Sequence, residues 1–357
     1  MPHAPDIRVR TLLRLGRHEV YRGQCFHAGL LFEGHSGDGH GGDGRDGGGR
    51  VGHRLDVHRA GDASVLATAR LVHTAEFIHP FGPGAVIVVG KHYLPRAGWR
   101  TYHSVARLVR GRLRVRTRTM PSGLQVEQFG GSPRAMFFNE PGSRQVYRWT
   151  CIGPRALGPE IHLPGTMIVA GNGLYVLERN HVVPGRENLA RIDLATRSIT
   201  RTFPTPRRRL RALLDLPGTP WLAVAETWAE QVLIVEKATN RLARVLPVPG
   251  GPVALARLGR GLAVFCDEPR RIDFLDPTDG AAGPLARWNL TDVGAELANV
   301  TAFDIDPESG DVYLRSPFHP RVEGGEPAVT LIADASGRTR ARCGTVRDGG
   351  PHAIAGA

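Results

Sequence analysis

Gly173-Leu174-Tyr175-Val176-Leu177-Glu178 decides the fold of this chain, because the same pattern returns twice further along it. The two copies are Trp221-Leu222-Ala223-Val224-Ala225-Glu226 and Gly261-Leu262-Ala263-Val264-Phe265-Cys266. A polar loop and a second apolar run follow each copy, and this run closes on an acidic residue. The acidic residues are Asp193, Glu236 and Asp276, which are 43 and 40 residues apart. A repeat of this length built from short strands is typical of the blades of a β-propeller.

Weaker copies of the pattern extend the repeat to seven units. Apolar runs at 54–57, 104–108, 145–149 and 328–334 fall near the positions that the period requires. We therefore predict an all-β chain, a seven-bladed β-propeller of four-stranded antiparallel blades, as one domain over 1–357. The blades are expected at 17–74, 75–120, 121–164, 165–205, 206–250, 251–292 and 298–346.

The third strand of the fourth unit carries a motif that can be compared with a known family. Arg191-Ile192-Asp193-Leu194-Ala195-Thr196, which follows a Gly-led aromatic strand and a polar loop, resembles the YVTN-type repeat of seven-bladed propellers. Val235-Glu236-Lys237-Ala238-Thr239-Asn240 keeps the Thr but has Glu in place of Asp. The resemblance is clearest over 165–290 and implies the fold only, because propellers of this kind have many functions.

The composition indicates an arginine-rich chain without a secretory or membrane signal. The formal net charge is +12, and lysine occurs only at Lys91 and Lys237. Four cysteines are scattered singly, without the paired spacing of a zinc site. The N-terminal segment has no apolar core, and no apolar run reaches the length of a membrane span. We expect a cytoplasmic protein with reduced thiols and no membrane span.

The loops that follow the second strand of each unit are the predicted functional region, because such loops gather at one mouth of a propeller channel. Four units are expected to end that strand in Glu at the same register, namely at Glu33, Glu140, Glu178 and Glu226. The expected ligand-binding residues at this mouth are Glu140, Glu178, His181, Glu226, Trp228, Asp267, Glu268, Arg270 and His319. Carboxylates mixed with Arg and His can bind a polar ligand, hold a divalent metal or transfer protons.

Three functions stay open at this point. The first is a propeller that binds a small polar ligand or a partner protein at the mouth. The second is an enzyme that uses the same residues, namely a lyase, an isomerase or a metal-assisted hydrolase, with catalytic residues and cofactor unknown apart from a candidate divalent metal. The third is a nucleic-acid binder that acts through arginine. The chain has no phosphate loop, dinucleotide fingerprint or Gly-x-Ser-x-Gly elbow.

Two further segments carry expectations. Ten of the twenty residues at 34–53 are Gly, with three His and three Asp among them, so we predict a disordered insertion; loose metal chelation is the alternative. Arginines alternate at 110–118, and a second group lies at 207–211. Arg112, Arg114 and Arg116 are predicted to point to solvent, either as protection of an outer strand or as phosphate contacts. Isolated histidines, including His58, His73, His79 and His162, are expected to be structural.

Overall fold

The structure is a computed structural model, and it confirms the all-β class. It describes residues 8–9, 19–27, 29–37, 53–59, 64–82, 84–94, 98–120, 126, 128–132, 135–140, 144–150, 153–158, 160–162, 164–178, 187–203, 209–258, 261–278, 283–289, 302–305, 311–315, 330–334 and 354–355. These residues form six four-stranded antiparallel sheets, one three-stranded sheet and one two-stranded sheet. The described part contains no helix, and so none that could cross a membrane.

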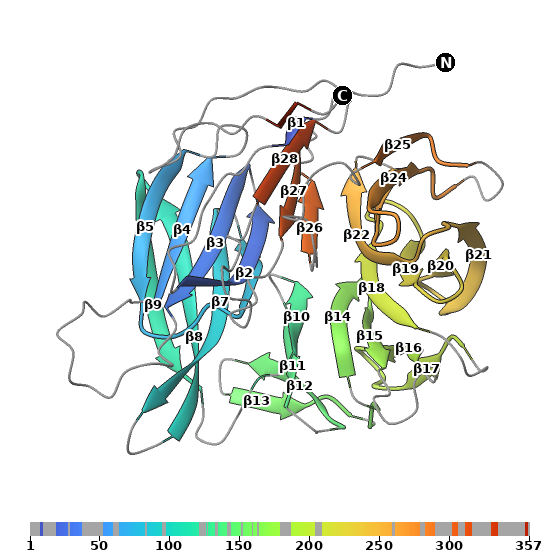
Figure 1. Ribbon diagram of the computed structural model, residues 1–357. Helices are drawn as coiled ribbons and strands as arrows, with labels where there is room; N and C mark the ends of the chain where they lie inside the picture. Colours follow the sequence, from blue (N-terminus) through green and yellow to red (C-terminus); the bar gives the residue numbers. More distant parts are fainter. Residues whose placement is uncertain are drawn as a thin grey trace. The chain divides into compact units, whose positions relative to one another are not determined.

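The chain forms two compact units, which are described separately. The second unit, Gln125–Asp292, contains four sheets of four consecutive strands each, β10–β13, β14–β17, β18–β21 and β22–β25 (Figure 1). The strands are β10 (Gln128–Ser132), β11 (Ala135–Asn139), β12 (Val146–Thr150), β13 (Gly153–Ala156), β14 (Pro164–Ala170), β15 (Gly173–Glu178), β16 (Asn188–Asp193), β17 (Ile199–Arg201), β18 (Leu210–Asp215), β19 (Trp221–Glu226), β20 (Gln231–Glu236), β21 (Arg241–Pro247), β22 (Pro252–Leu258), β23 (Gly261–Cys266), β24 (Arg271–Leu275) and β25 (Ala286–Asn289). The strands β15 and β19 coincide with the repeated stretches quoted from the sequence, 173–178 and 221–226.

The first unit combines the two ends of the chain, Met1–Leu124 and Val293–Ala357. Its sheets are β2–β5, β6–β9, the three-stranded β26–β28 and the pair β1–β29. The strands are β1 (Arg8–Val9), β2 (Glu19–His27), β3 (Leu30–Gly37), β4 (His53–Arg59), β5 (Val65–Leu71), β6 (Phe77–Gly82), β7 (Ala85–Leu94), β8 (Gly98–Val109), β9 (Arg112–Thr119), β26 (Ala302–Ile305), β27 (Asp311–Arg315), β28 (Thr330–Asp334) and β29 (Ile354–Ala355). The single domain expected over 1–357 stays a prediction.

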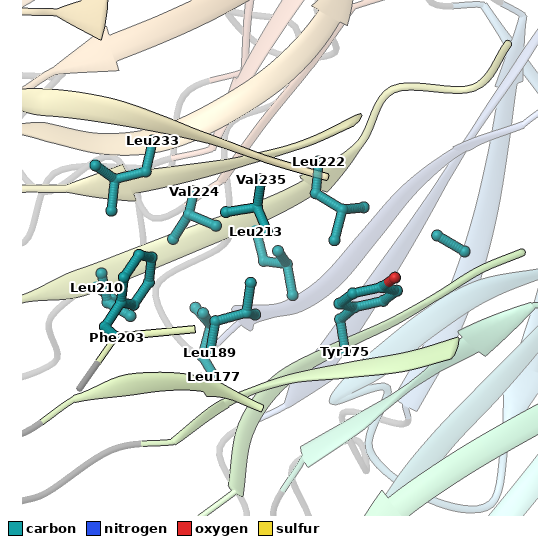
Figure 2. Close-up of a cluster of buried hydrophobic side chains, with 11 residues drawn as sticks. Tyr175, Leu177, Leu189, Phe203, Leu210, Leu213, Leu222, Val224, Leu233 and Val235 are labelled. Carbon is teal, nitrogen blue, oxygen red and sulfur yellow. The ribbon is translucent and has the colours of Figure 1, made fainter. Parts of the chain in front are cut away.

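Successive sheets pack face to face, with their first strands adjacent. In the second unit β10 lies beside β14, β14 beside β18, and β18 beside β22; in the first unit β6 and β26 both contact β2. Figure 2 shows the apolar cluster between two of these sheets, where Tyr175 and Leu177 from β15 meet Leu222 and Val224 from β19. Both faces of β15 are buried, which explains why the decisive sequence stretch is continuously apolar.

Glycine allows the close approach of the first strands. A Cβ built on Gly130 in β10 would lie 2.2 Å from the carbonyl oxygen of Met167 in β14. No side chain fits at that distance, so the contact between the two strands requires glycine at this position.

The acidic residues of the repeat have a structural role in the turn after the third strand. Asp193 Oδ1 accepts hydrogen bonds from the backbone N–H groups of Ala195 and Thr196, both at 2.9 Å. Asp276 Oδ1 accepts one from the N–H of Thr278 at 2.7 Å. The backbone bonds lower the pKa of Asp193. The pKa of Asp276 is lowered mainly by a hydrogen bond from the Thr278 hydroxyl at 2.6 Å, and also by this N–H bond. An acid at this position therefore shapes the turn, which accounts for its recurrence in the sequence.

Two predictions for the first unit concern the insertion at 34–53 and the end of the seventh expected blade. The insertion predicted over 34–53 is shorter, because β3 continues to Gly37 and β4 begins at His53; residues 38–52 lie outside the described residues. A Cβ on Gly34 would lie 2.3 Å from Cβ of Ala75, so this glycine serves packing. The last part of the seventh expected blade, 335–346, lies outside the described residues. The chain ends pair, with Arg8 opposite Ala355 and Val9 opposite Ile354.

Candidate functional site

Two turns of the second unit carry the expected ligand-binding residues that the structure shows as exposed, namely Trp228, Asp267 and Glu268. Thr227–Glu230 joins β19 to β20, and the turn at 267–270 joins β23 to β24. These turns follow the second strand of their sheets, so they occupy equivalent places in two successive repeats. Both are short because the paired strands meet directly, with Glu226 opposite Gln231 and Cys266 opposite Arg271.

Both turns rest on the same connection, the segment at 249–252 that leads from β21 into β22. Thr227 Oγ1 donates a hydrogen bond to the carbonyl of Pro252 at 2.8 Å. On the other side, the N–H of Asp267 donates to the carbonyl of Gly251 at 3.5 Å, and that of Glu268 donates to Gly250 at 3.3 Å. Both turns are therefore linked by hydrogen bonds to one segment, and we call them together the paired-turn surface, 227–230 with 267–270.

An aromatic ring and carboxylates dominate the paired-turn surface. Trp228 is 54% exposed, although tryptophan is usually well covered. The guanidinium carbon of Arg209 lies 5.9 Å from the centroid of the Trp228 ring, a cation–π contact, and the Thr227 N–H donates to the Arg209 carbonyl at 2.9 Å. Asp267 and Glu268 are exposed, while Arg270 is half-buried. The paired-turn surface thus carries an exposed aromatic ring in one turn and two exposed carboxylates in the other.

Glu178 does not present its carboxylate to solvent. It lies on the same face of β15 as Leu174 and Val176, which pack against the preceding sheet, because alternate residues of a strand share a face. Its carboxylate is 4% exposed and accepts two hydrogen bonds from Arg201, at 2.8 Å each, and one from the His162 N–H at 3.1 Å. This arrangement gives Glu178 a structural function in the sheet.

Glu226 and Cys266 occupy the position of Glu178 in the next two sheets, and both are buried. Gln231 Nε2 donates a hydrogen bond to Glu226 Oε2 at 2.6 Å. Burial raises the pKa of the Cys266 thiol to about 12, so this cysteine is neutral and inert at physiological pH. The strand-end position therefore points into the packing between sheets.

The remaining predicted residues are placed as follows. The register shared by Glu140 with the other strand-end glutamates was wrong, because β11 ends at Asn139 and the half-buried Glu140 follows it. Glu33 is buried within β3, with Oε2 3.4 Å from Nε2 of His58. His181 and His319 lie outside the described residues. Within the described ranges, no group of three or more His, Cys, Asp or Glu side chains could hold a metal ion.

A buried histidine network in the first unit had no signal in the sequence. His73 is fully buried, and its Nδ1–H donates to the Thr74 carbonyl at 2.6 Å. Nε2 therefore accepts from the Ser104 hydroxyl at 2.7 Å, and Ser104 Oγ lies 2.7 Å from Thr117 Oγ1. The ring stacks on Tyr102 with centroids 5.8 Å apart. Burial is the main cause that lowers the His73 pKa to about 4, and nearby His53, His103 and His92 add to it.

His53, His92 and His103 lie on β4, β7 and β8, and His73 lies in the connection between β5 and β6. Because they are far apart in the sequence, no local spacing indicates that they lie close together. Burial likewise lowers the pKa of His103, with a further contribution from Arg118. The imidazole of His73 is neutral at physiological pH and serves as a buried hydrogen-bonding group.

Comparison with known proteins gives no relative that could assign a function. No protein-family model matches the chain, and no curated protein matches it. Function therefore has to be inferred from the residues at the surface described above.

Proposed function

We propose that the chain is a seven-bladed β-propeller of the YVTN-type class that serves as a binding module for a partner protein. The fold part of the proposal is supported by the order of the sheets, each built from consecutive strands, and by the adjacency of their first strands within each unit. The pairing of β1 with β29 supports a ring that closes through the chain ends.

The exposed ring of Trp228 is the observation that carries the functional part. Trp and Arg are the residues most enriched among those that dominate binding energy at protein interfaces. Both residue types occur here, because the guanidinium of Arg209 contacts the ring of Trp228. The backbone of the turn is also held, since the Thr227 N–H donates to the Arg209 carbonyl. A ring that is already held in place loses little conformational freedom on binding, which favours affinity.

The charges around Trp228 define the chemistry of the partner. Asp267, Glu268 and Glu230 are exposed on the paired-turn surface, although the chain as a whole carries a net charge of +12. A cationic side chain can pair with these carboxylates and also lie on the face of a tryptophan ring. We therefore propose that the surface binds a basic segment of a partner protein that also carries apolar residues.

A small polar ligand is less well supported at this surface. Such ligands usually occupy concave sites that cover most of their area, whereas Trp228 stands on a tight turn between two strands. Two of the four glutamates expected to contact the ligand, Glu178 and Glu226, are buried, and Glu178 is held by Arg201. An extended peptide is the occupant that best fits an exposed ring and exposed carboxylates carried by two separate turns.

The test uses two short fluorescein-labelled peptides of equal length, one of Arg and Leu, and one in which each Arg is replaced by Glu. Fluorescence anisotropy should show binding of the basic peptide only. Trp228→Ala should weaken it at least about tenfold, equivalent to about 1.4 kcal/mol. Leu285→Ala removes another exposed apolar side chain, 69% exposed, and should leave binding unchanged.

The carboxylates are tested separately. Asp267→Asn with Glu268→Gln should weaken binding and reduce its dependence on salt, because charges at the rim of an interface act by attraction through solvent. Equal binding of both peptides, or unchanged binding by Trp228→Ala, would contradict the proposal.

A further inference from the structure

The hairpin β8–β9 in the first unit carries a dense positive charge. Seven arginines and no Asp or Glu occur between Gly98 and Thr119. Arg112, Arg114, Arg116 and Arg118 alternate with other residues along β9, and all four are exposed, as predicted for the first three. Leu113 and Val115, which alternate with them, pack against the core between the sheets β2–β5 and β6–β9. The arginines therefore line the opposite face of one outer strand.

Neighbouring positions on β8 add to this row. Arg107 lies directly opposite Arg114 in the antiparallel register and is exposed. Like charges that face each other across two strands destabilise the pairing. None of the exposed arginines of this hairpin forms an ion pair with another described residue, so no carboxylate in the described part offsets the repulsion.

The geometry of the row favours an extended polyanion. Alternate residues on a strand are about 6.8 Å apart, so the four arginines of β9 span about 20 Å. Their separation is below the Debye length of about 8 Å at physiological salt, so the potentials of neighbouring arginines add. A small anion can pair with only one or two of these arginines, whereas a chain of phosphates can neutralise every position along the row.

We propose that the β8–β9 hairpin binds the phosphate backbone of double-stranded nucleic acid without sequence preference. Guanidinium groups form paired hydrogen bonds with phosphate, and side chains of this kind make most of the contacts that proteins form with the backbone of nucleic acid. The exposed residues of the row include no aromatic ring on which unpaired bases could stack. An acidic protein partner would require apolar or aromatic anchors at the centre of its interface, and the row supplies none.

The probe for the test is a fluorescein-labelled DNA duplex of mixed sequence, followed by fluorescence anisotropy at increasing KCl concentration. The variant combines Arg112→Gln, Arg114→Gln and Arg116→Gln. The slope of log K against log salt should fall by about three, because each lost phosphate contact removes about one unit. Exchange of the same three residues for Lys should keep the slope and weaken binding, since lysine cannot form the paired bonds.

The control combines Arg148→Gln, Arg155→Gln and Arg241→Gln, which removes the same charge from exposed positions elsewhere. It should leave the slope unchanged. The inference is overturned if this control lowers the slope equally, or if the duplex does not bind at low salt. It is also overturned if the hairpin variant loses binding to polyglutamate or to phosphatidylserine vesicles while it keeps binding to the duplex.

Discussion

Arg201 holds the carboxylate of Glu178 from two strands away. Arg201 ends the outermost strand β17, Glu178 ends β15, and Nε–Oε2 and Nη2–Oε1 are each 2.8 Å apart. The hydrogen bond raises the pKa of the arginine. Because the His162 N–H also donates to this carboxylate, one buried charge links the sheet β14–β17 to the connection that precedes it.

The first prediction concerns this ion pair. Glu178→Gln keeps the size of the side chain but removes the charge, so the folded protein should lose about 1–3 kcal/mol of unfolding free energy. Urea denaturation measures this loss. Glu160→Gln is the matched control, because Glu160 and Arg144 lie 3.7 Å apart with both side chains exposed; it should change stability by less than about 1 kcal/mol. An equal, small effect of both variants would contradict a structural role for Glu178.

The second prediction concerns the dependence of stability on pH. The folded-state pKa of His73 is about 4, below the ordinary value of 6.5, so the folded protein binds fewer protons than the unfolded chain between these values. The contribution of His73 to stability should therefore be constant above pH 6.5 and fall by about 3 kcal/mol as the pH decreases through 4.

His73→Gln tests this contribution, because glutamine can donate to Thr74 and accept from Ser104 without titrating. Urea denaturation at several pH values should show a smaller loss of stability for the variant in the acidic range. His103 also titrates with a lowered pKa, so part of the dependence should persist. Identical pH profiles of the variant and the native protein would show that His73 is not the group responsible.

The third prediction concerns the contact between first strands. Gly130→Ala places a methyl group 2.2 Å from the Met167 carbonyl, so β10 and β14 must separate, at a cost of about 1–3 kcal/mol. Gly283→Ala is the control, because nothing lies within 4 Å of its Cβ position. Thermal unfolding of the two variants measures the difference; no difference between them would contradict close packing at Gly130.

Much of the strand pattern could be predicted from the sequence because the inner strands of the sheets, such as β15, β19 and β23, are buried on both faces. A strand such as β15, which is apolar at nearly every position, is easily seen between polar turns. The end of β11 could not be located in this way, because the hydrophobic run gives no sign that pairing stops at Asn139 rather than Glu140. The apolar residues of a run therefore predict that a strand exists, whereas its exact ends depend on the pairing with neighbouring strands.

The candidate site was less predictable, because the exposure of a side chain depends on contacts between residues that are distant in the sequence. The sequence places Glu178, Glu226 and Trp228 in equivalent loops, but exposure separates them: the glutamates point into the packing between sheets, and the tryptophan stands on a turn. The partner of Glu178 is 23 residues away, a distance that no local spacing rule covers. The histidines around His73 meet only through strand pairing between β7 and β8 and the packing beside them.

The binding of a basic segment by Trp228 can be observed directly by ¹⁹F NMR of protein labelled with 5-fluorotryptophan. The chain has five tryptophans, and the resonance missing from the spectrum of Trp228→Phe identifies Trp228. On addition of the Arg and Leu peptide, this resonance should shift while the other four stay in place, and the Glu and Leu peptide should shift none. A shift of another tryptophan, or no shift at all with the basic peptide, would contradict the proposed function.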